Sequence, residues 1–259
     1  MRAFNAIITI AYRDLTKFLR DRVRLVATFI FPFLFIGVLG SGFQANLGRE
    51  LGYNYLVFIF TGVLAQALFQ SSAMGVISLI QDREEDFSQE IFVAPVSRPG
   101  IVLGKIIGES LVSLAQGAGI IIFGFILGVP LTLEKLALLV PVAVASCLLG
   151  GAFGILVLSN IKTQRATTQI FPFVIFPQLF LAGVFNPITR LPPLLAALSR
   201  LAPMTYAVDL MRGVYYAGTD TAAAITLHHP LVNVAIIAAL FALFLAIGTI
   251  LFVRNERDR

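Results

Sequence analysis

The amino-acid sequence predicts an all-α membrane protein with six transmembrane helices, an N-terminal amphipathic interface helix and short re-entrant helices before the last span. Of its 259 residues, 58% are hydrophobic and 13% are charged, whereas soluble domains average roughly 25% charged residues. Several apolar runs exceed the ~18 residues that mark a membrane-crossing helix. Because backbone polar groups in lipid must be paired within their own segment, we expect these runs to be helical.

Residues 1–22 are predicted to form an amphipathic helix along the inner membrane interface. Its apolar residues recur at helical spacing, namely Phe4, Ile7, Ile8, Ala11, Leu15, Phe18 and Leu19. The basic residues Arg13, Lys17, Arg20 and Arg22 lie mostly off that face, as is typical of interfacial helices. A secretory signal is the competing interpretation, but the apolar core at 6–11 is too short and no small-residue cleavage site follows it.

The transmembrane domain, residues 23–259, contains the six predicted spans. They cover residues 23–40, 55–80, 101–128, 136–159, 168–185 and 230–253. Small residues repeat at i+4 spacing along the third and fourth spans, at Gly100, Gly104 and Gly108 and at Ser146, Gly150 and Gly154. Such stripes favour close helix packing over ligand contact. The single cysteine, Cys147, excludes an internal disulfide and is interpreted as a small packing residue.

Lys and Arg are distributed unevenly between alternate loops. One side holds Arg2, Arg13, Lys17, Arg20, Arg22, Arg24, Arg83, Arg98, Lys105, Lys162, Arg165, Arg254, Arg257 and Arg259, and the other holds Arg49, Lys135, Arg190, Arg200 and Arg212. The positive-inside rule makes the richer side cytoplasmic, so both termini and the loop 81–99 are predicted to face the cytoplasm. This topology explains the net charge of +5 better than nucleic-acid binding does, because the basic residues form no patch of their own.

The loop 186–229 is predicted to face outward and to contain two short helices. Its apolar stretches are broken by prolines and are too short to span, as expected of re-entrant or surface-lying helices at the outer end of a pathway. The candidate outer gate comprises Asn186, Pro187, Pro203, Asp209 and Arg212. Asp209 and Arg212, at i and i+3, are in position to pair. An interfacial helix with a surface ion pair is the alternative.

The loop 81–99 concentrates acids on the face where basic residues prevail elsewhere. Asp82, Glu84, Glu85, Asp86 and Glu90 are offset only by Arg83 and Arg98. Anionic lipid would require the opposite charge, and a metal or acid–base site would need partners that the loop lacks. Phe87, Ile91 and Phe92 would lie opposite the acids on a short helix, which could dock into a groove on a cytoplasmic partner. A solvated cap remains equally compatible with these residues.

Two blocks of the sequence resemble the permeases of ABC-2 type transporters. DREEDFSQEIFVAPVSRPGIVLGK is similar to their first cytoplasmic loop, and LAGVFNPITRLPPLLAALSRLAPMTYAVDLMR is similar to their signature block. The order of elements also agrees, from the interface helix to a short basic tail. YLVFIFTGVLAQALFQSS followed by the acids most resembles the daunorubicin-resistance type. The resemblance implies the type V, or ABC-2 exporter, fold in the cell membrane of a prokaryote.

The resemblance further implies a permease dimer that works on two copies of a separate ABC ATPase subunit. ATP and Mg²⁺ would bind that partner, and this chain would hold no cofactor, metal or catalytic residue of its own. Its nearest approach to a phosphate loop, GIVLGKI, lacks the required spacing and a following Ser or Thr. The coupling residues implied by the resemblance are Arg83, Glu84, Glu85, Asp86, Phe87, Phe92, Pro95 and Arg98.

The predicted substrate pathway is apolar, with a few amides. Its candidate residues are Gln66, Gln70, Phe173, Phe176, Gln178 and Phe180. Amides in lipid normally turn inward to find hydrogen-bond partners, and prolines bend the Phe-rich span 168–185. A lipid-facing or core role for the phenylalanines is the alternative. Glu109, one turn beyond Lys105, is expected to pair with it or to face the bundle.

These features predict an exporter of an apolar or amphipathic drug or lipid-like substrate. Export of a lipid-linked polysaccharide is the nearest alternative. An intramembrane enzyme would need a carboxylate, His or Ser constellation inside the spans, where Glu109 is the single acid. An ion-coupled carrier would show repeated halves or an ionisable group near the midplane, and the sequence contains no convincing repeat.

Overall fold

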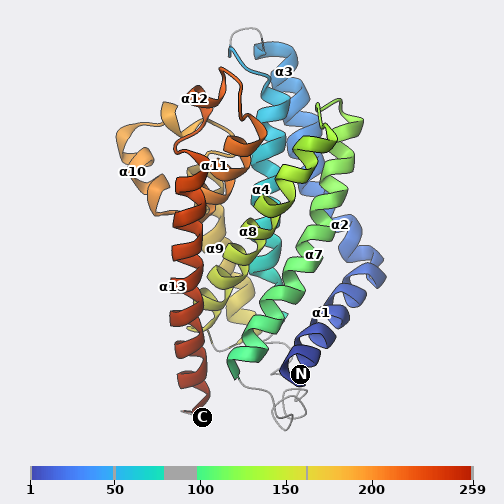
Figure 1. Ribbon diagram of the computed structural model, residues 1–259, viewed down its shortest axis with the longest axis vertical. Coiled ribbons are helices and arrows are strands. Elements are labelled where there is room, and N and C mark those ends of the chain that lie inside the picture. Colours follow the sequence, from blue (N-terminus) through green and yellow to red (C-terminus); the bar gives the residue numbers. More distant parts are fainter. Residues whose placement is uncertain (1, 49–50, 79–97, 162, 258–259) are drawn as a thin grey trace.

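The computed structural model describes residues 2–48, 51–78, 98–161 and 163–257, which form an all-helical bundle with no strand among them. The helices are α1 (Arg2–Arg20), α2 (Arg22–Pro32), η1 (Phe33–Gly40), α3 (Ser41–Leu47), α4 (Tyr55–Gly75), α7 (Arg98–Ile126), α8 (Leu133–Leu158), α9 (Gln164–Leu181), η2 (Ile188–Arg190), α10 (Pro193–Leu201), α11 (Pro203–Tyr215), α12 (Ala222–Ile225) and α13 (Pro230–Arg257). The long helices run side by side, and both chain ends lie at the same end of the bundle (Figure 1).

Five stretches in the described part of the chain are long and apolar enough to cross a membrane. They are Leu25–Asn46, Tyr55–Gly75, Pro99–Ile126, Leu133–Leu158 and Ala222–Leu251. The pair α10 and α11, bent by 95°, would make a sixth if it were one broken span. The predicted fifth span, 168–185, is helical as α9 but is not among the five, because its first turns carry Gln164, Arg165 and Gln169. Membrane crossing by α9 stays a prediction.

The first span is not a regular α-helix. After Pro32 the chain continues as the π-helical η1 and then as α3. Proline removes a backbone donor and clashes with the preceding turn, so the α-helical hydrogen-bond register is interrupted there. The Ser41 hydroxyl donates to the Gly37 carbonyl across the end of η1. The predicted boundary at Gly40 is therefore a change of helix type, and the helix itself ends at Leu47.

The helix α4 forms the centre of the bundle. In its apolar window 78% of the residues are buried, against 11% in the window spanning α12 and α13. A Cβ added at Gly150 would overlap the Phe69 carbonyl, and one at Gly154 would overlap the Ala73 backbone. These α8 glycines therefore let two helix backbones approach closely, which confirms the packing role predicted for the small-residue stripe.

The N-terminal helix packs against the lower part of α7 (Figure 1). Ala11 and Phe18 are buried, whereas Tyr12 and Leu19 are more than half exposed. A Cβ at Gly108 of α7 would lie 3.1 Å from the Ala11 Cα, so the stripe on α7 also serves close packing. The helix predicted for 1–22 is thus present with one buried side, and its location at a membrane interface stays a prediction.

Candidate functional site

The predicted coupling residues Arg83, Glu84, Glu85, Asp86, Phe87, Phe92 and Pro95 lie outside the described residues. Arg98 begins α7. The end of α4 and the beginning of α7, which flank the predicted coupling loop, lie at the same end of the bundle as both termini (Figure 1). This shared end agrees with the predicted grouping of the termini and the loop on one side.

A buried group of charges joins α1 to α7 near this end. The Lys105 ammonium lies 2.6 Å from Asp14 Oδ2 and 2.8 Å from Glu109 Oε1. Lys105 is 1% exposed, and Arg13 pairs with the other Asp14 oxygen at 3.2 Å. Buried ions are tolerated when each has an opposite charge beside it, and here two cations face two anions. The predicted pairing of Lys105 with Glu109 is confirmed, and Asp14 is an additional partner.

The same charges contact the end of α4. The Ser78 hydroxyl donates to the Gly75 carbonyl at 2.7 Å and lies 3.4 Å from Glu109 Oε1. A side chain at Gly75 would overlap the Glu109 carboxylate. Lys105, Asp14, Glu109 and Ser78 therefore link three helices that are distant in the sequence, and we call these four residues the inner charge cluster.

A pocket of about 540 Å³ lies between α2, α4 and α7, and Ser78 of the inner charge cluster is one of its lining residues. Gln66, Gln70 and Gln116 contribute its amides. The Gln66 amide nitrogen donates to the Gln70 side-chain oxygen, and Gln70 Nε2 in turn lies 3.8 Å from Met74 Sδ. The structure thus brings together two predicted pathway residues, Gln66 and Gln70. We call this cavity the inner pocket.

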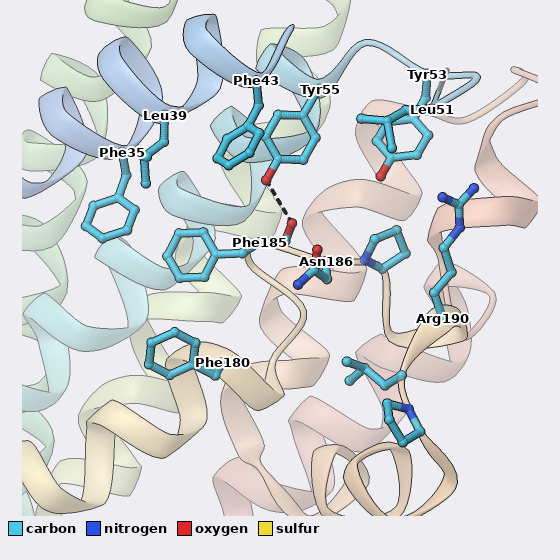
Figure 2. Close-up of a pocket in the computed structure, with 13 residues that line it drawn as sticks. Phe35, Leu39, Phe43, Leu51, Tyr53, Tyr55, Phe180, Phe185, Asn186 and Arg190 are labelled. Atoms are coloured by element: carbon cyan, nitrogen blue, oxygen red, sulfur yellow. Dashed lines mark hydrogen bonds between the residues drawn. The ribbon is translucent and has the colours of Figure 1, made fainter. Parts of the chain in front are cut away.

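A second pocket, of about 650 Å³, lies at the opposite end of the bundle and is lined mainly by aromatic and apolar side chains. Figure 2 shows Phe35, Phe180 and Phe185 along one part of it, with Tyr53 and Arg190 at the other. The Tyr55 hydroxyl donates to the Phe185 carbonyl at 3.1 Å and so connects α4 to the segment after α9 (Figure 2). We call this cavity the outer pocket.

Three of the predicted residues border the outer pocket. They are Phe180 from the pathway set and Asn186 and Pro187 from the gate set. Burial raises the pKa of Tyr53, although Arg190 and Arg212 oppose the shift. The Tyr53 hydroxyl is therefore neutral at physiological pH, and the Arg190 guanidinium lies 5.8 Å from the Tyr53 ring centre. A cation within about 6 Å of an aromatic ring centre is attracted to the ring face.

The predicted gate residue Arg212 is buried and clamps the turn after α9 to α4. It is 1% exposed and donates to the carbonyls of Val184, at 3.1 Å, and Phe58, at 3.4 Å. Its guanidinium lies 3.7 Å from the Phe58 ring centre. A Cβ at Gly62 would come within 2.8 Å of the guanidinium, so glycine leaves the space that the arginine needs.

Asp209 does not form the ion pair predicted with Arg212, and no salt bridge joins these two described residues. Instead its carboxylate accepts hydrogen bonds from the backbone N–H groups of Leu227, at 2.7 Å, and His228, at 2.9 Å. The Asn233 side-chain amide donates a third, at 2.7 Å. The carboxylate is better satisfied by these three donors, two just before α13 and one in its first turn, than by Arg212, which contacts α4 instead. Asp209 therefore attaches α11 to α13.

The bend between α10 and α11 occurs at Pro203, the first residue of α11, as the sequence predicts. Gln178 on α9 is 6% exposed and accepts a hydrogen bond from the Met204 N–H at 3.4 Å. This predicted pathway residue therefore anchors α9 to α11. Whether the bent pair re-enters the membrane stays a prediction.

The two remaining predicted pathway phenylalanines on α9 point away from the chain. Phe173 is 79% exposed, Phe176 is 58% exposed, and neither lines the inner pocket. Within one chain the structure therefore does not bring them together with Gln66 and Gln70. Their exposure fits a face toward lipid or toward a second subunit.

Sequence reasoning missed Asp14, Gln116 and Asn233. Asp14 is an acid on a helix whose other charges nearby are basic, and that mismatch of sign was a usable signal. Gln116 is an amide within an apolar run, the same signal that identified Gln66. Asn233 carries the same signal, but its partner Asp209 could not be predicted from helical spacing, because it is 24 residues away. Among the described residues no group of three His, Cys, Asp or Glu is placed to hold a metal.

Comparisons with known proteins give a consistent result. Residues 5–216 match the ABC-2 type transporter family. A Cyanophora paradoxa protein named as a transport permease (ycf38) is 30% identical over 201 residues, which cover 76% of this chain and 69% of that protein. Nodulation protein J of Rhizobium meliloti is 28% identical over 190 residues, covering 71% and 70%.

The inner membrane transport permease YadH of Escherichia coli K12 is 26% identical to this chain over 212 residues, covering 80% of this chain and 81% of that protein. The family match extends over most of the chain, from α1 through the end of α11, and thus includes both pockets and the inner charge cluster. The chain therefore belongs to the ABC-2 type transporter family.

Proposed function

We propose that this chain is the transmembrane permease subunit of an ATP-binding cassette exporter that moves an apolar or amphipathic substrate out of a prokaryotic cell. The observation that carries the proposal is the family match over residues 5–216, on a bundle of membrane-length helices. Family membership implies association with a separate ABC ATPase subunit. In this proposal two ATPase copies serve two permease copies, both termini are cytoplasmic, and ATP and Mg²⁺ bind the partner.

The acidic loop would be the point at which the ATPase acts. Glu84, Glu85 and Asp86 offer charges to Arg or Lys on the partner, and Phe87 and Phe92 offer apolar anchors. The inner charge cluster supports this role, because it ties both helices that flank the loop, α4 and α7, to α1. A displacement of the loop would then move three helices together.

The two pockets would mark the ends of the substrate route. Both are bordered by α4 and by the first span, with the inner pocket toward the shared end of the termini and the outer pocket at the opposite end. The exposed phenylalanines of α9 would face a second, identical chain across the route. Closing and opening of the outer pocket would involve the segment that Arg212 clamps.

Export of a lipid-linked polysaccharide is the second candidate function, favoured by the amides of the inner pocket. An ion-coupled carrier is less well supported, because the buried charges of the inner charge cluster are paired with one another and lie near one end of the bundle rather than at its middle.

Co-purification with a candidate ATPase tests the coupling role. We expect the triple variant Glu84→Lys, Glu85→Lys, Asp86→Lys to reduce association at least ten-fold and to abolish stimulation of ATP hydrolysis by the permease. The control variant Glu134→Lys, Asp220→Lys reverses exposed acids outside the loop and should associate normally. Normal association and unchanged hydrolysis in the triple variant would refute the proposal.

A further inference from the structure

We propose that the inner pocket of a single chain binds the uncharged, hydrogen-bonding headgroup of an amphipathic molecule and rejects charged headgroups carrying the same tail. The role of this site in transport rests on the proposed function, whereas its chemistry rests only on the pocket. Its volume of about 540 Å³ falls within the range of roughly 300–1,000 Å³ that is typical of small-molecule sites.

The pocket contains hydrogen-bonding groups that the protein leaves unsatisfied. Gln66 is 2% exposed, and its side-chain oxygen has no hydrogen-bond partner. Buried polar atoms normally have partners, so an orphaned acceptor that borders a cavity indicates a donor supplied by a ligand. Gln70 Nε2 has only the weak acceptor Met74 Sδ, at 3.8 Å. The wall therefore offers one free acceptor and one nearly free donor, which a hydroxyl or amide satisfies together.

Gln116 adds a third amide from the opposite helix. It is 6% exposed, lines the pocket, and has no hydrogen-bond partner for its side chain among the described residues. Gln66 and Gln70 lie on α4, whereas Gln116 lies on α7. A small headgroup between the two helices could therefore be held from both sides, in the manner of a few polar groups placed within an otherwise apolar site.

A charged headgroup would find no counter-charge among the described residues that line the pocket. None of the described residues that line it is Asp, Glu, Lys or Arg. Among the described residues, Glu109 contacts the lining residue Ser78 at 3.4 Å, and its carboxylate is already paired with Lys105. Moving an ionised group from water into such a site is costly when no counter-charge receives it. A neutral headgroup loses only its hydration, which the amides replace.

The pocket extends along α4 from a buried end to an exposed end, and apolar residues of α2 line its facing wall. Along α4 it runs from Gln66, which is buried, to Met74, which is 42% exposed, a rise of about 12 Å over eight residues. Met74 is in the last turn of α4, and that end of α4 lies at the end of the bundle that carries both termini (Figure 1). Phe31 and Pro32 of α2 line the facing wall. The headgroup would thus sit at the deep end, with the tail along α2.

Protection of a cysteine in the pocket tests this inference without an ATPase. Ala67→Cys, made in a Cys147→Ala background, places a thiol beside Gln66. Its rate of maleimide labelling is measured in lipid nanodiscs with dodecylglycerol, dodecyl sulfate or dodecyltrimethylammonium at equal mole fraction. We expect dodecylglycerol to slow labelling at least five-fold and the two charged amphiphiles to slow it less than two-fold. Ile122→Cys, 62% exposed on α7, is the control thiol and should show no headgroup dependence.

Adding Gln66→Leu or Gln116→Leu to the reporter should remove the protection by dodecylglycerol. Equal protection by all three amphiphiles, no protection by any, or protection that survives both leucine variants would overturn the inference. If Gln66→Leu fails to yield folded protein, Gln116→Leu decides alone. If dodecylglycerol does not slow labelling but the permease still associates with the ATPase and stimulates ATP hydrolysis, this site is rejected and the proposed function is retained. If dodecylglycerol slows labelling as expected but the permease neither associates with the ATPase nor stimulates ATP hydrolysis, the proposed function is rejected and the site is retained.

Discussion

Replacing Lys105 with methionine is expected to destabilise the protein strongly, because Lys105 holds two buried carboxylates together. Methionine has a similar length and suits an apolar site, so the main change is the loss of the charge. Asp14 would keep Arg13, at 3.2 Å, as a partner. Among the described residues, Glu109, which is 4% exposed, would keep only the Ser78 hydroxyl, at 3.4 Å.

Removing one partner of a buried ion pair typically costs about 3–5 kcal/mol, because the remaining charge is left in a poorly hydrated place. For a chain of this size each kcal/mol lowers the unfolding midpoint by about 2–4 °C. We therefore expect Lys105→Met to lower the midpoint by roughly 6–20 °C. The triple variant that also carries Asp14→Asn and Glu109→Gln should recover most of this loss, because its cluster is neutral throughout.

Thermal unfolding of the purified chain can be followed by far-ultraviolet circular dichroism. A fluorogenic maleimide that reacts with Cys147, which is fully buried in α8, supplies a second readout. Lys17→Met removes an exposed lysine from α1 and is the matched control. A midpoint for Lys105→Met equal to that of the control would refute the argument. A triple variant no more stable than Lys105→Met would also refute it, because the loss would then not come from unpaired charge.

Three further substitutions test other contacts, each by the same unfolding midpoint. Gly150→Ala should destabilise by about 1–3 kcal/mol, because the new methyl group overlaps the Phe69 carbonyl, whereas Gly42→Ala on α3, with open space around it, should stabilise or be neutral. Arg212→Lys should cost about 2 kcal/mol, because an ammonium cannot stack flat on the Phe58 ring as the planar guanidinium does while donating to the two carbonyls; an unchanged midpoint would contradict this role of Arg212. Asp209→Asn should cost about 1–3 kcal/mol, because the new amide group faces donors, and a more stable variant would show that these hydrogen bonds contribute nothing.

Much of the candidate site follows from residues that are unusual in an apolar environment. Gln66 and Gln70 were predictable because an amide within a span needs a partner, and the pairing of Lys105 with Glu109 followed from their spacing of one helical turn. Asn186 and Pro187 were predicted as gate residues and border the outer pocket, and their role in gating stays a prediction. The pairing of Asp209 with Arg212 was wrong, because helical spacing shows which residues share a face but not what else lies in front of that face.

The all-helical class and the positions of most helices follow from the sequence, because burying apolar length in lipid requires helices whatever their mutual arrangement. The family followed from the resemblance of two sequence blocks. The central place of α4, the contact of Asp14 with Lys105 across 91 residues and the meeting of Gln116 with Gln66 in one pocket became visible in the folded bundle. Those contacts depend on how helices cross and on how closely their backbones approach at Gly108, Gly150 and Gly154. Helical periodicity sets the direction of each side chain about its own axis, whereas its partner is set by the packing of the whole bundle.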